Sequence, residues 1–167
     1  MAVETERKFK VLNDDWRQGV SGQYLKQAYL SLDPERTIRV RIAGTEAWLT
    51  VKGPVQGHSR LEFEYKIPVS DGEAMLSSLC QSKPIEKIRY RIPFQGHIFE
   101  VDEFKGENLG LVITEIELKN EGEHFACPHW MGEEVTADRR YYNSYLAQNP
   151  FSLWEDQDQT VQETTKN

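Results

Sequence analysis

The chain begins with the stretch Met1-Ala2-Val3-Glu4-Thr5-Glu6-Arg7-Lys8-Phe9-Lys10-Val11. Glu4, Glu6 and Lys8 lie two positions apart in it. Alternate side chains of a β-strand point to the same face, so these three charged groups would share one side. Apolar residues such as Val3 and Phe9 flank them, which is unusual for a strand that faces water. We therefore interpret this strand as one wall of a polar interior, with the odd-numbered side chains pointing outward.

The same alternation recurs in six later segments, each of the length of a β-strand. A further extended segment at 24–30 brings the predicted strands to eight. The six alternating segments are 37–42 with Arg39 and Arg41, 47–52 with Thr50 and Lys52, 60–67 with Arg60, Glu62, Glu64 and Lys66, 85–92 with Lys87, Arg89 and Arg91, 98–104 with Glu100 and Asp102, and 111–119 with Glu115 and Glu117.

For any one of these strands, the simplest interpretation is a sheet that turns its charged side chains to water. The opposite face, however, is apolar in most of them, as in 38–42 and 88–92. Eight strands suffice to close a barrel, which removes exposed edges and leaves room for one small ligand. We therefore predict a mainly β (α+β) fold, an eight-stranded antiparallel closed β-barrel with a few covering helices.

Three helices are expected besides the strands. A short one is predicted at 13–17, and a second begins with the S-x-x-E motif of Ser70 and Glu73 and runs to about Ser82. The third lies near the C-terminus and ends near Gln148, before Pro150. Residues 1–150 are expected to form one domain, and the polar residues 151–167 a disordered tail.

A barrel of this kind would gather charges of both signs in its interior. Burying such charges is costly unless each has a partner, so the interior should be wet, internally paired and suited to a highly charged ligand. A polyphosphate with a divalent metal matches both signs, because Arg and Lys bind phosphate oxygens and carboxylates bind Mg²⁺ or Mn²⁺. The expected cations are Lys8, Arg39, Arg41, Lys52, Lys87 and Arg89, with Arg60, Lys66 and Arg91 as further candidates, and the expected carboxylates are Glu4, Glu6, Glu62, Glu64, Asp102, Glu115 and Glu117.

The composition excludes several other classes of protein. The 167 residues carry a net charge of −7, which argues against general nucleic-acid binding or attachment to a membrane surface. The apolar runs are too short to span a bilayer. Cys80 and Cys127 are far apart and no signal peptide is evident, so we expect a cytoplasmic protein with a small-molecule ligand, and a homodimer stays open.

At this point the sequence resembles a known family. Glu4-Thr5-Glu6-Arg7-Lys8 resembles the E-x-E-x-K signature of CYTH-domain proteins, the triphosphate tunnel metalloenzymes. The resemblance runs from about residue 1 to 148, and the motifs follow in the family's order. They are R-x-R at Arg39 and Arg41, T-x-K at Thr50 and Lys52, E-x-E at Glu62 and Glu64, K-x-R-Y at Lys87 to Tyr90, the aspartate strand at Asp102, and the final E-x-E at Glu115 and Glu117.

The resemblance implies a β tunnel that binds a triphosphate and cleaves or transfers it with Mg²⁺ or Mn²⁺. It assigns Glu4, Glu6, Glu115 and Glu117 to the metal, with Asp102 joining them or orienting water there. It assigns Lys8, Arg39, Arg41, Lys52, Lys87 and Arg89 to the phosphates, and of these Lys8, Arg39, Lys87 and Arg89 are the expected catalytic residues. Glu62 and Glu64 support either the metal or the cations, and the segment Arg139-Arg140-Tyr141-Tyr142 lies where family members can plug one tunnel mouth.

The function implied is hydrolysis of inorganic tripolyphosphate to pyrophosphate and phosphate. The alternatives are a nucleoside or thiamine triphosphatase, a class IV-like adenylate cyclase, and a non-catalytic polyphosphate or nucleotide sensor. A sensor has less use for four matched glutamates beside an anionic ligand.

Overall fold

A computed structural model describes residues 2–154 of the chain. Nine strands dominate it, joined by two α-helices and four short 3₁₀ helices. In chain order these are β1 (Val3–Val11), η1 (Asp15–Arg17), β2 (Gly22–Ser31), β3 (Thr37–Ala43), β4 (Glu46–Lys52), β5 (Ser59–Ile67), α1 (Val69–Ser78), β6 (Ile85–Phe94), β7 (His97–Phe104), η2 (Gly106–Asn108), β8 (Val112–Leu118), β9 (Met131–Glu134), η3 (Arg139–Tyr141), α2 (Asn143–Leu146) and η4 (Phe151–Leu153).

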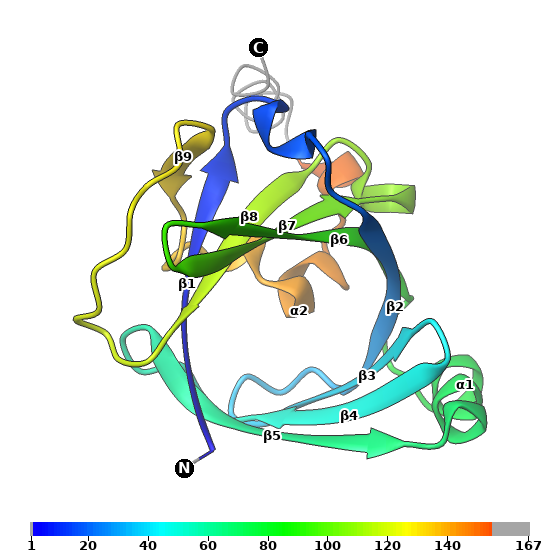
Figure 1. Ribbon diagram of the computed structural model, residues 1–167. Coiled ribbons are helices and arrows are strands. Elements are labelled where there is room, and N and C mark those ends of the chain that lie inside the picture. Colours follow the sequence, from blue (N-terminus) through cyan, green and yellow to red (C-terminus); the bar gives the residue numbers. More distant parts are fainter. Residues whose placement is uncertain (1, 155–167) are drawn as a thin grey trace.

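Eight of the strands form a closed antiparallel barrel, which confirms the predicted fold. Their order is β5-β4-β3-β2-β6-β7-β8-β1, and pairing between β5 and β1 closes the ring. Figure 1 shows these strands surrounding a central space, with α1 packed outside against β3 and β4. The ninth strand, β9, pairs with β1 outside the ring and was not expected from the sequence.

Alternation along each strand decides which side chains face the interior, and the register decides which of them lie side by side. Glu6 lies opposite Glu117 and Lys8 opposite Glu115 in the pairing of β1 with β8. The outward direction expected for the odd-numbered residues of β1 is confirmed by their partners, since Thr5 bonds to Ser59 and Arg7 to Glu134.

The apolar core lies outside the barrel and at one of its ends. The outer faces of β1, β7 and β8 pack against the segment 119–131, with Phe99 and Trp130 in edge contact. A second cluster closes one end of the interior, where Ile113 packs with Leu146 and Phe151. Ile113 shares its face of β8 with Glu115, so the interior changes from charged to apolar along one strand.

The helices differ from the sequence expectations in their bounds. Helix α1 begins at Val69, after the extended Pro68, so Ser70 lies inside the helix and caps nothing. It ends at Ser78 rather than near Ser82. In place of the single C-terminal helix that was expected, the structure has two short elements, η3 and α2, and η4 follows after Pro150.

The ordered domain extends past the predicted boundary at 150. Phe151 is buried and Trp154 packs edge-on against Tyr141. Residues 155–167 of the expected tail lie outside the described residues. Among residues 2–154, no helix combines the length and the apolar character that a membrane crossing requires.

Candidate active site

The barrel encloses a polar cavity of about 240 Å³. Each of the eight barrel strands contributes at least one charged or hydroxyl side chain to its lining, because alternate residues of every strand point inward. Tyr142, Asn143 and Ser144 contribute from the C-terminal segment. In Figure 1, α2 appears within the outline of the ring of strands.

The predicted site residues line this cavity, with Asp102 as the exception. Those that line it are Glu4, Glu6, Lys8, Arg39, Arg41, Lys52, Glu62, Glu64, Lys87, Arg89, Glu115 and Glu117. Of the further candidates, Arg60 and Arg91 line it, whereas Lys66 is exposed and pairs with Glu46 at 2.9 Å. The geometry brings these groups together, and their individual roles stay predictions.

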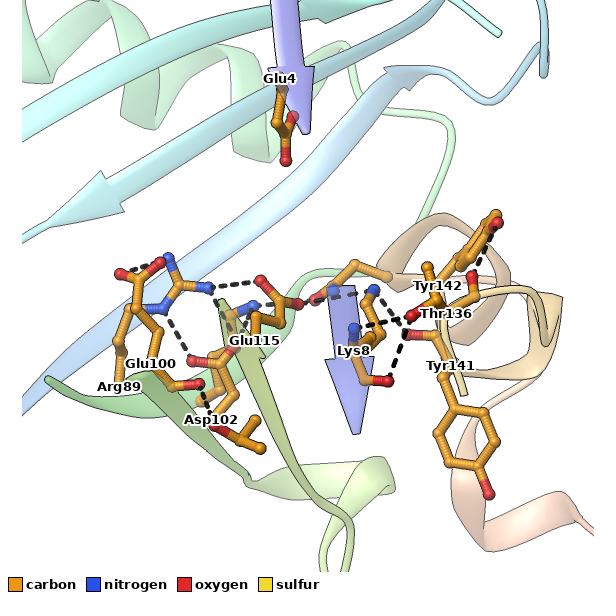
Figure 2. A network of polar contacts seen from close by, with 12 residues as sticks. Glu4, Lys8, Arg89, Glu100, Asp102, Glu115, Thr136, Tyr141 and Tyr142 are labelled. Atoms are coloured by element: carbon orange, nitrogen blue, oxygen red, sulfur yellow. Dashed lines mark hydrogen bonds and ion pairs between the residues drawn. The ribbon is translucent and has the colours of Figure 1, made fainter. Parts of the chain in front are cut away.

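Asp102 lies behind the residues that line the cavity, between Arg89 and Lys87. It is 1% exposed, accepts hydrogen bonds from Arg89 Nε at 2.8 Å and Nη2 at 2.9 Å, and pairs with Lys87 Nζ at 2.8 Å. Burial would raise the pKa of Asp102, but Arg89 and Lys87 outweigh it and hold that pKa below its usual value. Asp102 is therefore a charged anchor for both cations. Figure 2 shows its contact with Arg89.

Glu115 links the two sides of the same network. Its carboxylate lies 3.5 Å from Lys8 Nζ and 3.7 Å from Arg89 Nη2. Burial opposes the charge of Glu115, yet Lys8 and Arg89 lower its pKa. Lys8 Nζ also donates to the backbone carbonyl of Tyr141 at 3.2 Å. Figure 2 shows these contacts as one continuous network, with Glu4 set apart from it.

A second network surrounds Lys52. Its Nζ lies 2.8 Å from Glu4 and 3.1 Å from Glu62. Burial, and then the hydrogen bond with Glu4, raises the pKa of Glu62 to about 7. Burial also opposes the charge of Glu4, but Lys52 and the hydrogen bonds with Glu62 and Glu6 together lower the pKa of Glu4. One lysine thus serves two carboxyl groups, of which Glu4 is the stronger acid.

Other carboxylates of the cavity have no cation of their own. Glu6 and Glu117 make no ion pair within residues 2–154. Burial, followed by repulsion from Glu115 and Glu4, raises the pKa of Glu6 well above its usual value. Burial and then Glu4 and Glu100 also raise the pKa of Glu117. This surplus of hard oxygen donors fits a divalent cation such as Mg²⁺ or Mn²⁺.

The carboxylates are not gathered into a finished metal cage. Within the described part of the chain, no three His, Cys, Asp or Glu side chains are placed to hold a metal ion together. Lysines intervene instead, as Lys52 does between Glu4 and Glu62. Glu4 and Glu62 would have to leave Lys52 to bind a cation, whereas Glu6 and Glu117 would not have to leave an ion pair within residues 2–154.

Two cations of the cavity, Arg41 and Lys87, have a lowered pKa. Arg41 makes no ion pair within residues 2–154, and burial, with repulsion from Arg39 and Arg89, lowers its pKa to about 9. Burial is also the main reason that the pKa of Lys87 falls to about 7, despite the attraction of Asp102. An anion bound at this side of the cavity would stabilise both charges.

Several lining residues were not expected from the sequence. They are Tyr29, Thr37, Glu100 as an interior group, and the C-terminal Asn143 and Ser144, whereas Tyr142 belongs to the segment expected at a tunnel mouth. Tyr29 shares its face of β2 with Gln27, a signal that a search for charged residues alone does not detect. The C-terminal residues carry no local signal, because contacts with strands more than a hundred positions earlier bring them to the cavity.

Comparisons with known proteins agree with this geometry. Residues 2–145 match the CYTH domain. The chain is 47% identical over 151 residues to an inorganic triphosphatase of Acetivibrio thermocellus, covering 90% of this chain and 97% of the relative. It is 38% identical over 152 residues to an inorganic triphosphatase of Nitrosomonas europaea, covering 87% and 97%. The crystal structure of an inorganic triphosphatase superposes with a TM-score of 0.63 at 36% identity, over 88% of this chain and 95% of that one.

Proposed function

Because this chain belongs to the CYTH domain family, we propose that it is a divalent-metal-dependent hydrolase of inorganic tripolyphosphate. The products are pyrophosphate and phosphate. Two inorganic triphosphatases, each of which matches this chain over nearly its whole length, support this substrate. Free thiols at Cys80 and Cys127 are consistent with a reducing cytoplasm, which is part of the proposal.

One observation carries the proposal: a single cavity holds surplus charge of both signs. Glu6 and Glu117 lack cations, and Arg41 lacks an anion, within the same 240 Å³. A ligand that brings only phosphates would leave the carboxylates repelling one another and the ligand. A polyphosphate together with a divalent cation would stabilise both sets of groups.

The residues of the chain then divide into two sets. Glu4, Glu6, Glu115 and Glu117 would hold the metal, which when bound supplies Lewis-acid polarisation of phosphate oxygens and an activated water. Lys8, Arg39, Arg41, Lys52, Lys87 and Arg89 would bind the phosphate oxygens and stabilise the charge that moves onto the departing phosphate. Lys8, Arg39, Lys87 and Arg89 are the proposed catalytic residues among them.

The surrounding contacts refine three of the expected roles. Asp102 is proposed to orient Arg89 and Lys87 rather than to bind metal, since both cations already occupy its oxygens. Glu64 lies 3.7 Å from Arg39, which supports pairing with a cation. Glu62 has contacts of both kinds, to Lys52 and to Glu4, so it can serve either group.

A panel of substrates and metals tests the proposal. Tripolyphosphate, ATP, GTP and thiamine triphosphate are each assayed for phosphate release with Mg²⁺ and with Mn²⁺. We expect the highest kcat/KM for tripolyphosphate and no turnover in a chelator. Faster turnover of an organic triphosphate would favour the nucleoside or thiamine triphosphatase, cyclic AMP formation would favour the cyclase, and tight binding without turnover would favour the sensor.

A further inference from the structure

A fully buried glutamine connects the cavity to the segment that closes the barrel. Gln27 lies on β2, is 0% exposed and faces Arg41 directly in the register of β2 with β3. Its Oε1 accepts a hydrogen bond from Arg41 Nε at 2.8 Å. Its Nε2 donates to Asn143 Oδ1 at 3.1 Å, at the start of α2. Both ends of the buried amide are therefore used.

Asn143 extends this connection to a second cation. Its Oδ1 also accepts from Lys87 Nζ at 3.0 Å. The result is a hydrogen-bonded relay from Arg41 through Gln27 and Asn143 to Lys87. Each end of the relay is a cation that lines the cavity, whereas Gln27 itself lies behind the cavity wall.

Arg41 is held differently from the neighbouring Arg39. Arg39 Nη2 donates to Thr50 at 3.2 Å and lies 3.7 Å from Glu64, so its terminal group already has partners. For Arg41, Gln27 holds the inner Nε, and within residues 2–154 no carboxylate pairs with the guanidinium. The terminal nitrogens of Arg41 are left for a ligand, in the fork geometry that matches phosphate oxygens.

We propose that Gln27 and Asn143 are positioning residues, which set Arg41 and Lys87 for phosphate binding and make that setting depend on the docked C-terminal segment. The inference rests on the proposed function, because Arg41 and Lys87 are placed in the phosphate site there. Gln27 and Asn143 are separated by 116 positions, so only the closed fold can form the relay. A purely structural amide pair would instead stabilise the protein without acting through either cation.

A double-mutant cycle separates these two roles. Gln27→Met keeps the length of the side chain and removes both hydrogen bonds, and Arg41→Lys keeps the positive charge and removes the Nε donor. Binding of inorganic tripolyphosphate is measured by calorimetry for both single variants and the double variant. We expect Gln27→Met to raise the Kd about 10- to 100-fold, the usual effect of losing a hydrogen bond to a charged group. In the Arg41→Lys background the same change should have little effect.

The control and the contradicting outcome follow from the same assay. Gln18→Met makes the same chemical change at an exposed position and should leave the Kd unchanged. Equal effects of Gln27→Met in both backgrounds, or an unchanged Kd in folded Gln27→Met, would overturn the inference. Should Gln27→Met fail to fold, Asn143→Leu breaks the same link from the other side, and an unchanged Kd in folded Asn143→Leu would overturn the inference.

The Asn143 half of the relay has its own test. Asn143→Leu should raise the Kd for tripolyphosphate. Combined with Gln27→Met, it should raise the Kd by less than the two single changes together predict, because both changes break the link between Gln27 and Asn143. Asn149→Leu provides the matched control at an exposed position of the same segment. Additive losses would contradict the relay.

Failure of this inference and failure of the proposed function give different results. If the wild-type protein binds tripolyphosphate but does not cleave it, the function is wrong and the binding cycle still decides the relay. If it cleaves tripolyphosphate while the cycle is additive, the function holds and the relay is wrong. A wild-type protein that binds no tripolyphosphate would overturn both.

Discussion

Glu6 on β1 lies directly opposite Glu117 on β8, and within residues 2–154 neither carboxylate is paired with a cation. Like charges at facing positions of an antiparallel pair destabilise a sheet. Burial is the main reason that the pKa of both groups is raised, followed by repulsion from Glu115 and Glu4 for Glu6 and from Glu4 and Glu100 for Glu117. The fold thus retains an unfavourable arrangement at the place where the proposed function needs a cation.

Neutralising either member of this pair should lower activity without lowering stability. Glu6→Gln and Glu117→Gln should each lower kcat/KM at least about tenfold and weaken Mg²⁺ or Mn²⁺ binding in calorimetry. The free energy of unfolding should stay the same or rise by up to about 1 kcal/mol, because the variants remove a buried carboxylate that neighbouring carboxylates repel. Glu35→Gln, in an exposed turn, is the matched control. Wild-type metal affinity in both site variants would contradict the metal assignment.

Changing Asp102 should lower stability and phosphate binding and leave activation by the metal unchanged. Asp102→Ala leaves Lys87 and Arg89 without their buried carboxylate, which should lower the free energy of unfolding by about 3–5 kcal/mol in urea titrations. Phosphate binding should weaken because both cations lose their anchor. The metal concentration that half-activates the enzyme should not change in the milder Asp102→Asn. A large increase in that concentration would instead make Asp102 a metal ligand.

The link between β1 and β9 should be sensitive to acid. Glu134 accepts from Arg7 at 2.8 and 2.6 Å and from Thr136 at 2.6 Å. The hydrogen bond from Arg7 is the main reason that the pKa of Glu134 lies below its usual value, against a smaller opposing effect of burial. A lowered pKa stabilises the folded state above the unfolded pKa of about 4.3, and this contribution disappears as the pH falls through the folded value.

Glu134→Gln should therefore cost up to about 1 kcal/mol of unfolding free energy at pH 7, since the pair is partly exposed. Urea unfolding repeated in acid, below the folded pKa of Glu134, should show a smaller difference from the wild type. Glu73→Gln, exposed on α1, should show no difference at either pH. A cost that is equal at both pH values would mean that the ion pair does not contribute.

The docking of α1 depends on a glycine. A Cβ at Gly72 would lie 2.8 Å from the Cβ of Ala47 and 3.6 Å from Ile42 on the barrel. Gly72→Ala should therefore destabilise the protein by about 1–3 kcal/mol by overpacking, although alanine favours helices. Ser78→Ala, exposed on the same helix, should be neutral or slightly stabilising. Both are measured by chemical denaturation, and a stabilised Gly72→Ala would show that α1 can move away from the barrel.

The alternation of residues along the chain was sufficient to predict the barrel and the charged interior. A strand's backbone sends neighbouring side chains to opposite faces wherever it lies, so parity is a local property that survives folding. This is why Glu4, Glu6 and Lys8 could be assigned to the interior before any pairing was known. Strand β9 and the divided C-terminal helix could not be predicted, because contacts with distant residues decide them.

Parity says which face a side chain occupies, and it does not say how far along the barrel that side chain lies. Glu100 and Asp102 share a face of β7, but Glu100 lies opposite Glu115 and lines the cavity, whereas Asp102 lies opposite Ile113 near the apolar end. The sequence alone therefore determined the strands, their inward faces and the charge of the interior. The tertiary structure decided how deep in the barrel each side chain lies, because register and closure depend on the pairing of distant strands. It thereby placed Asp102 against Arg89 and Lys87, and it placed Gln27 and Asn143 between Arg41 and Lys87.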